Sequence, residues 1–433
     1  MDGYFEFERH GTGYRKEILA GITTFLTMAY IIVVNPAVLE AAGIPKGPST
    51  TATILSAAFG TVVMALYAKR PFAIAPYMGE NAFIAFTVVK SMGYTWQAAL
   101  GAVFVAGALF TVLTVLKIRS WLAEALPLNL KLSFAVGIGL FLTFIGLNET
   151  GIVRLGVPGA PVALGDMTGP APLLTVFCFF AIAFLSMRKV PGAILLGMLA
   201  TTFLSFLFRA TPVPERWVGL PPDLSPILFR IDLRTALTPG FFPVVLTVFV
   251  MAFVDTVGTL IGLSARAGLL DAKGNLPDIE KPMLADALAT TAAPLLGTTT
   301  TGAYIESAAG IEEGGRTGFT SLVVAALFLL SMFLAPLFTA VPPQAYGAVL
   351  VVIGSYMIPP IARIDFKDPT ELIPCFLTIA LISFSYNIGV GMTAGIISYP
   401  LLKVLAGRWR EVPRGLWILA LLSLSFYVYY PYP

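Results

Sequence analysis

Three acidic residues lie inside strongly apolar stretches of the sequence. Asp255 lies in FVDTVGT, Glu306 in AYIESAAG, and Glu80 precedes Asn81 in YMGENAF. A charged side chain at the centre of a membrane helix costs at least about 2.5–3.5 kcal/mol, so such residues are candidates for function by default. Carboxylates can accept N–H groups of a neutral ligand through strong, charge-assisted hydrogen bonds. Crowded together in a dry site, they can also exchange protons near neutral pH.

Each of these acids also has a purely structural explanation. A buried hydroxyl or backbone group could satisfy Asp255, and Glu306 could cap the start of a helix. Glu80 suits a helix N-terminus electrostatically without any ligand. The amide of Asn81 is a neutral donor and acceptor that fits the edge of a heterocycle, and the hydroxyl of Thr259 lies close to Asp255 in the sequence.

Glu306 lies in a segment that cannot cross a membrane as one ordinary helix. The stretch 297–310, GTTTTGAYIESAAG, has four β-branched threonines that favour an extended backbone, and Gly302 then permits a break. A short helix starting at Tyr304 would carry Glu306 in its first turn. The pattern therefore predicts a strand, a break and a half-helix.

The stretch 71–86 shows the same order of features. A short extended run ends at Pro76, Gly79 follows, and a helix is expected to begin at Glu80. Non-helical backbone at membrane depth survives only where it is buried in protein or lines a cavity. Broken segments in corresponding places of two halves are typical of a transporter's binding site.

The composition indicates a polytopic membrane protein, with 57% hydrophobic and only 12% charged residues, against about a quarter charged in soluble domains. The net charge of +3 is too small to suggest nucleic acid. Cys178 and Cys375 lie in apolar runs, so we expect neither a disulfide framework nor a metal site. The single histidine, His10, precedes the first span, which leaves carboxylates for proton chemistry inside the membrane.

The N-terminus lacks the layout of a signal peptide. The sequence also has no GxxxxGK[ST] motif that would bind ATP phosphates. We therefore expect no ATP hydrolysis by that route and no cofactor.

Fourteen membrane spans are expected, because each needs about 20 apolar residues. The expected ranges are 17–40, 51–68, 71–90 (broken), 95–116, 130–148, 170–187, 191–208, 240–264, 283–296 (short), 297–313 (broken), 317–340, 344–361, 369–386 and 389–406. A further apolar stretch, 415–430, could span the membrane or lie at its surface.

The distribution of basic residues predicts that both ends are cytoplasmic, in a multi-pass protein of the cell (inner) membrane. With that orientation, most of the 27 basic residues fall on the inside, and the outside holds only Lys46, Lys90, Arg154, Arg209, Arg216, Arg230 and Arg234.

The two halves of the sequence resemble each other weakly but in the same order. Residues 20–43 resemble 245–268, residues 190–207 resemble 387–405, and the broken segments are third and tenth. With seven spans in each repeat, an odd number, the second repeat must be inverted relative to the first.

Four motifs in this order resemble the nucleobase-ascorbate transporter superfamily, in particular its adenine, guanine and hypoxanthine permease branch. They are EILAGITTFLTMAYIIVVNPAVL at 17–39, PYMGENAFIAFTVV at 76–89, VDTVGTLIG at 254–262 and YIESAAGIEEGGRTG at 304–318. The resemblance runs from about residue 5 to residue 410. It implies an all-α polytopic fold of seven plus seven inverted spans, with a short strand plus half-helix in spans 3 and 10.

The resemblance also implies a division into a core domain and a gate domain. The core would comprise 1–118 (spans 1–4) and 240–341 (spans 8–11), and the gate 119–209 (spans 5–7) and 342–410 (spans 12–14). The external loop 210–239 would join the repeats, and 411–433 would form a C-terminal apolar segment. The family further implies proton symport, an elevator-like movement of the core, and a homodimer formed through the gate.

In the family, the substrate lies between the half-helices and is held by acids that match Asp255 and Glu306 and by a polar residue that matches Asn81. We expect a small-molecule nucleobase as partner and no nucleic acid. The predicted substrate-binding residues are Glu306, Asp255, Asn81, Gly79 and Tyr304, and the predicted proton-coupling residues are Asp255, Glu306 and Thr259.

Two positions depart from the purine branch. Members often carry an aspartate where this chain has Ala252, and an apolar residue is common where it has Glu80. The alternatives to a proton-coupled purine importer are a uracil, xanthine or anion carrier on the same fold, and a channel. A buried carboxylate argues against an anion. An enzyme is not expected, because the sequence has no HExxH, no metal-ligand cluster and no nucleophile-base pair.

Overall fold

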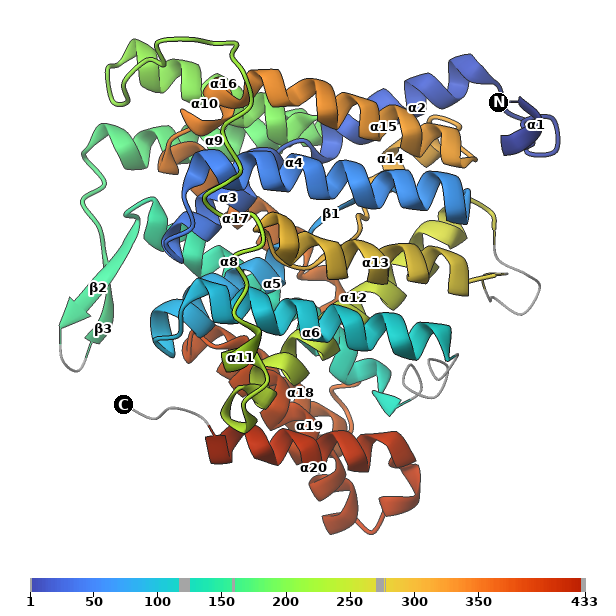
Figure 1. The fold of residues 1–433 in the computed structure, drawn as a ribbon. Coiled ribbons are helices and arrows are strands. Elements are labelled where there is room, and N and C mark those ends of the chain that lie inside the picture. Colours follow the sequence, from blue (N-terminus) through green and yellow to red (C-terminus); the bar gives the residue numbers. More distant parts are fainter. Residues whose placement is uncertain (1, 117–124, 158–159, 270–275, 277, 430–433) are drawn as a thin grey trace.

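The computed structural model describes residues 2–116, 125–157, 160–269, 276 and 278–429, and these residues fold almost entirely into helices (Figure 1). The first half contains α1 (Asp2–Phe5), α2 (Tyr14–Met28), α3 (Ile31–Ala41), α4 (Lys46–Val63), the π-helix η1 (Met64–Ala68), β1 (Ile74–Pro76), α5 (Met78–Ala82), the π-helix η2 (Phe83–Ser91), α6 (Trp96–Val115), α8 (Leu128–Glu149), β2 (Val153–Val157), β3 (Ala160–Leu164), α9 (Pro170–Met187) and α10 (Ala193–Leu207).

The second half repeats the order of long helix, strand, short helix and long helix around its own broken segment. It contains α11 (Leu233–Ala236), η3 (Pro239–Phe241), α12 (Phe242–Arg266), α13 (Glu280–Leu296), β4 (Thr301–Ala303), α14 (Ser307–Glu312), α15 (Gly318–Ser331), η4 (Met332–Leu334), α16 (Ala335–Thr339), α17 (Pro343–Tyr356), η5 (Pro359–Arg363), α18 (Pro369–Phe384), α19 (Ile388–Leu405), η6 (Trp409–Glu411) and α20 (Arg414–Tyr429).

Within the described residues, nine helical segments are long and apolar enough to cross a membrane. The other five expected spans differ in physical character. The seventh and thirteenth are the shorter apolar helices α10 and α18, the third and tenth are the broken segments, and the ninth is the 17-residue α13. Helix α20, in the stretch whose fate the sequence left open, packs against α19 and α12.

The two broken segments meet at the centre of the molecule, where β1 and β4 pair antiparallel. Ile74 lies opposite Ala303, and Pro76 lies opposite Thr301. The backbone N–H of Tyr77 donates to Thr300 at 3.0 Å, and that of Tyr304 donates to Ala73 at 2.9 Å. All three residues of each strand are buried. The extended segments therefore satisfy each other's backbone groups, as non-helical backbone in an apolar environment requires.

Gly302 has a different role from the predicted break, because it lies inside β4. A Cβ atom at this position would overlap the ring of Tyr77, which packs across the paired strands. The change from strand to helix comes later, over Tyr304 and Glu306, and α14 begins at Ser307. The threonine run and the glycine thus predicted the right elements, while the break lies two to four residues further along.

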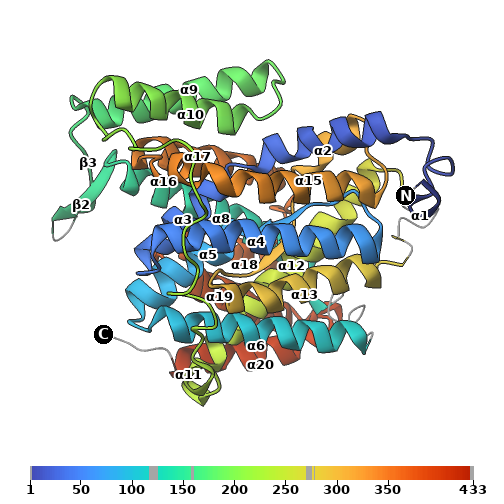
Figure 2. The same cartoon turned by 45° about the horizontal axis from the view of Figure 1, so that its top comes forward.

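The helices pack in two groups. One group surrounds the paired strands and comprises α2 to α6 and α12 to α16; the other comprises α8, α9, α10, α17, α18 and α19. In the second group, α9 and α10 lie side by side along one edge of the molecule (Figure 2). The groups touch where α5 packs on α8, α3 on α17 and α12 on α19.

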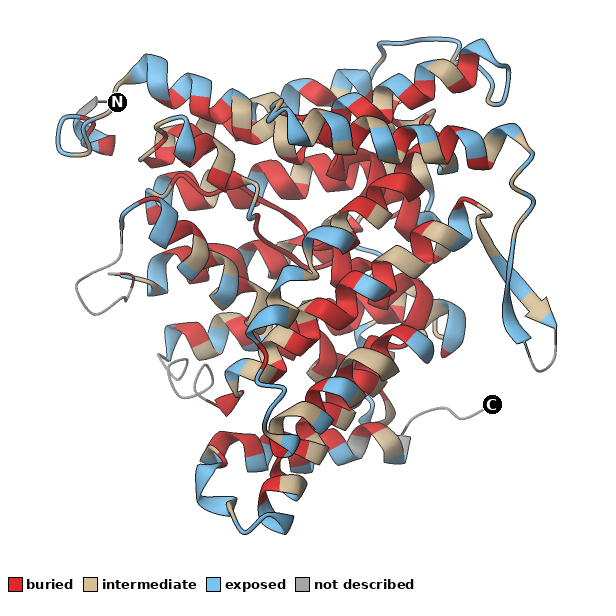
Figure 3. Cartoon of the chain, turned by 180° about the vertical axis from the view of Figure 1, so that it is seen from behind, coloured by how far each residue is buried: buried red, intermediate tan, exposed pale blue. Residues whose placement is uncertain are grey.

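Buried residues concentrate between these helices, whereas the hairpin of β2 and β3 stands away from them and is largely exposed (Figure 3). One buried carboxylate has an evident structural role. Glu17 of α2 is fully buried and accepts hydrogen bonds from the Thr320 hydroxyl at 2.6 Å, the Thr317 hydroxyl at 2.9 Å and the backbone N–H groups of Arg316 and Thr320. It therefore binds α2 to the start of α15.

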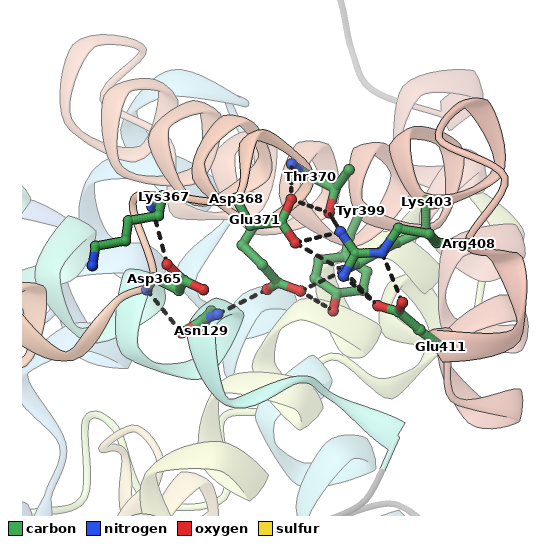
Figure 4. Close-up of polar contacts among 10 residues, drawn as sticks. All are labelled: Asn129, Asp365, Lys367, Asp368, Thr370, Glu371, Tyr399, Lys403, Arg408 and Glu411. Atoms are coloured by element: carbon green, nitrogen blue, oxygen red, sulfur yellow. Dashed lines mark hydrogen bonds and ion pairs between the residues drawn. The ribbon is translucent and has the colours of Figure 1, made fainter.

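A second buried charge lies at the ends of the helices of the second group (Figure 4). The side chain of Lys403, at the end of α19, is only 1% exposed, and its Nζ lies 2.8 Å from Glu371, 3.1 Å from Glu411 and 3.6 Å from Asp368. Arg408 pairs with Asp368 at 2.6 Å and with Glu411 at 2.7 Å. This charge cluster, Asp368, Glu371, Lys403, Arg408 and Glu411, joins α18, α19 and η6.

Candidate functional site

Glu306 immediately precedes α14, at the N-cap position rather than inside the first turn. The hydroxyl of Tyr30, between α2 and α3, donates to its Oε1 at 2.6 Å. Tyr30 is 1% exposed, whereas Glu306 is partly exposed. The carboxylate is thus held from one side by a buried phenol while it stays reachable from the other.

Asp255 lies in the middle of α12, which packs against β4, and is partly exposed. Its charge acts on the buried Glu80 and on the phenol of Tyr77. The neighbouring hydroxyl of Thr256 lies 3.5 Å from the hydroxyl of Tyr77. Thr259 follows Asp255 by one turn on the same helix and is partly exposed. Its role in proton coupling stays a prediction.

Asn81 lies in the half-helix α5, at one end of a fully buried chain of amides and hydroxyls. Its Nδ2 donates to the Oδ1 of Asn35 at 2.8 Å, and Asn35 donates to the hydroxyls of Thr53 at 2.7 Å and Thr298 at 2.9 Å. The Oδ1 of Asn81 accepts no hydrogen bond from the described residues. Because its nitrogen is committed to the fold, the oxygen is the atom left for a ligand's N–H group.

Tyr304 and Gly79 support the site rather than line an open cavity in this conformation. The hydroxyl of Tyr304 donates to the carbonyl of Pro76, and its ring stacks on Tyr77 with centroids 6.4 Å apart. Gly79 lies where α5 approaches α8, so that a Cβ would come within 3.0 Å of Ile138. Their predicted contact with substrate is not tested by this geometry.

Four residues near the site escaped the sequence analysis: Tyr30, Asn35, Tyr77 and Asp286. Asp286 of α13 is fully buried, and its charge acts on Glu80. The sequence alone does not indicate its burial, because α13 is short and only moderately apolar and Asp286 is only the seventh residue of this helix. The available signal was an acid in ADALATT, 12 residues before the threonine run that begins at Thr298.

A hollow of about 400 Å³ lies elsewhere, between α6 and the start of α12, and is lined mostly by apolar side chains such as Val105, Phe242 and Val245. None of the predicted site residues lines it. Within the described part of the chain, no three His, Cys, Asp or Glu side chains are arranged to hold a metal ion. The groups that the site offers are therefore carboxyl, amide and phenol groups and the backbone of two half-helices.

The inverted repeats and the paired broken segments define a polytopic membrane transporter. Residues 15–398 match the family described as "Permease family" (Xan_ur_permease), and the chain belongs to this family. This confirms the resemblance to the nucleobase-ascorbate transporter superfamily that the sequence motifs indicated.

Several relatives are similar over nearly their whole length. A permease of Methanocaldococcus jannaschii is 46% identical over 99% of this chain and 98% of its own. The guanine/hypoxanthine permease PbuO of Bacillus subtilis is 40% identical over 94% of this chain and 96% of its own, and the adenine permease AdeQ of Escherichia coli is 38% identical over 94% and 91%.

Among solved structures, the transmembrane domain of the cyanobacterial bicarbonate transporter BicA superposes with a TM-score of 0.65. It covers 88% of this chain and 97% of its own, at 16% sequence identity. At that identity the likeness concerns the fold alone, and it agrees with the predicted architecture of two repeats.

Proposed function

We propose that this protein imports purine nucleobases, of the adenine, guanine and hypoxanthine class, by proton symport across the cell membrane. The observation that carries the proposal is the carboxylate of Glu306, held by Tyr30 at the start of a half-helix and still partly exposed. The names of the relatives, which include adenine and guanine/hypoxanthine permeases, support the choice of purines.

A purine offers several N–H donors and ring-nitrogen acceptors at its edges, and the site provides matching groups. Glu306, Asp255 and the oxygen of Asn81 can accept N–H groups, and acceptance by a carboxylate gives the stronger bonds. Backbone N–H groups at the start of α5 can donate to ring nitrogens. At the start of α14, those of Ser307, Ala308 and Ala309 already donate to the carbonyls of Tyr304, Ile305 and Glu306. A site built of such acceptors favours a neutral base over an anion.

For the movement, we propose that the group around the paired strands acts as the core and the group of α8, α9, α10, α17, α18 and α19 as the gate. In this scheme the core slides against a gate that forms a homodimer, with both chain termini in the cytoplasm. Asp255, Glu306 and Thr259 would take part in proton coupling.

Uptake of labelled hypoxanthine, adenine, guanine, xanthine and uracil tests the cargo, in cells without their own purine carriers and with or without a protonophore. We expect saturable purine uptake that the protonophore abolishes. Purine uptake insensitive to the protonophore would contradict proton symport but would still support purines as the cargo. Non-saturable uptake would indicate a channel, and uptake of none of the five bases would mean that the cargo is another molecule.

Replacing Tyr30 with phenylalanine is expected to raise the KM for the preferred purine about tenfold. The change removes a hydrogen bond to a charged acceptor, which contributes about 1.5–3 kcal/mol to holding Glu306 in place. Initial uptake rates over a range of purine concentrations measure the change. The control is Tyr67→Phe, because Tyr67 is exposed; an equal effect of both substitutions would contradict a specific role for Tyr30.

A further inference from the structure

Glu80 differs from every other acid near the site, because it is fully buried and neither carboxyl oxygen accepts a hydrogen bond from another described residue. Glu17, which is equally buried, shows how this fold satisfies an ionised carboxylate: four donors surround it. A buried charge without donors or an opposite charge is strongly unfavourable. Apart from its own backbone N–H in the first turn of α5, Glu80 lacks the donors from described residues that surround the equally buried Glu17.

The charges that act on Glu80 oppose its ionisation further. They belong to Asp255 of α12 and Asp286 of α13, which are both acidic. The phenols of Tyr77 and Tyr304 also interact electrostatically with Glu80. The other elements packed against α5 are α3, α8 and η2. Their charged residues lie at or near the element ends: Glu40 in α3, Lys131 and Glu149 in α8, and Lys90 in η2.

Among Glu80, Asp255 and Asp286, Glu80 has the fewest groups that could stabilise a negative charge. Asp255 is partly exposed, so water can reach it, and the Oδ2 of Asp286 lies 3.4 Å from the backbone N–H of Ala303. A proton on Glu80 would remove the unsupported charge. It would also give the carboxyl an O–H group that can donate a hydrogen bond to a neighbouring carboxylate.

The burial of Glu80 depends on the contact between the two helix groups. Helix α5 packs on α8, and the neighbouring Gly79 is the point of close approach to Ile138. A sliding movement of one group past the other would separate these residues and change the exposure of Glu80. The protonation of Glu80 would then be linked to the movement.

We propose that Glu80, facing Asp255 and Asp286 at the boundary between α5 and α8, is a proton-binding site of this chain separate from the purine-binding carboxylate Glu306. The proton is bound in the conformation described here and leaves when the boundary opens. The link to transport depends on the proposed function, whereas the protonated state of Glu80 does not.

Infrared spectroscopy of the purified protein in lipid nanodiscs tests the protonated state without any purine. A protonated carboxylic acid has a carbonyl stretching band separate from those of carboxylates. We expect this band at neutral pH in the parent protein and in the exposed control Glu313→Gln, and its loss in Glu80→Gln. Glu80→Leu is the second variant, because it places no unpaired amide in the buried site. Absence of the band from the parent, or its persistence in both Glu80 variants, would overturn the proposal.

The linkage is tested by purine binding to the same samples from pH 6 to 9. For one linked proton, the parent's affinity should fall by up to about tenfold per pH unit in the range where Glu80 loses its proton. The affinity of the Glu80 variants should not change in that range, and an unaltered slope would contradict the linkage. If the parent binds no purine but the band is lost with Glu80, the proposed function fails and the proton site stands.

Discussion

Replacing Glu306 with glutamine is expected to lower kcat/KM for purine uptake by at least about 100-fold. Glutamine has the same length and keeps an oxygen that can accept from Tyr30, so the half-helix should keep its position. The change removes the negative charge and the proton-binding group. Hydrogen bonds to a charged acceptor contribute about 1.5–3 kcal/mol each, and about 1.4 kcal/mol corresponds to a factor of ten.

The matched control for this substitution is Glu313→Gln, at the other end of the same half-helix, where the side chain is exposed. Both variants should be extracted in parental amounts and elute at the same volume in size-exclusion chromatography. Uptake by Glu306→Gln equal to that of the control would show that Glu306 does not bind the substrate. Loss of uptake in both would mean that the half-helix tolerates no change of charge.

The broken segments could be predicted from the sequence because local chemistry determines them. β-Branched threonines in a row favour extended backbone, and the segments that follow are too polar for a lipid-facing helix. The expected order of strand and half-helix is confirmed in both repeats, in β1 with α5 and in β4 with α14. The expected helix starts differ by a few residues, since Glu80 lies within α5 and Glu306 precedes α14.

The residues that hold the site in place could not be predicted, because their role depends on contacts between distant parts of the chain. Asn35 lies in an apolar helix and is separated from Thr298 by 263 residues, yet the two form a hydrogen bond. Tyr30 resembles an ordinary membrane tyrosine until the fold brings Glu306 to it. Asp286 becomes a buried acid only when α13 packs beside β4. The sequence thus identified groups that could contact a ligand and missed those that hold them.

Replacing Lys403 with methionine is expected to lower the free energy of unfolding by about 3–5 kcal/mol, because removal of one partner from a buried ion pair leaves uncompensated charges. The side chain of Lys403 is 1% exposed and lies among Asp368, Glu371 and Glu411. Methionine fills a similar volume without the charge. The temperature at which the protein in detergent loses its size-exclusion peak measures the effect.

The control for the lysine substitution is Lys367→Met, at an exposed position beside the same cluster (Figure 4). The double variant Lys403→Met with Glu371→Gln should recover part of the lost stability, because it removes the carboxylate closest to the lysine. Equal thermal midpoints for Lys403→Met and Lys367→Met would show that Arg408 alone compensates the three acids.

The same charge cluster predicts how the stability of the protein depends on pH. Hydrogen bonds from Arg408 and then Lys403 lower the pKa of Glu411 from 4.5 to about 2, and hydrogen bonds from Thr370, together with Arg408, lower the pKa of Asp368. Acids with lowered pKa values stabilise the folded state above their ordinary pKa, and this contribution is lost as pH falls through the folded value. The thermal midpoint should therefore fall as pH drops from about 4.5 toward 2. In Arg408→Met, the pKa of Glu411 should return toward its ordinary value, so this acid-dependent fall should be smaller than in the parent protein.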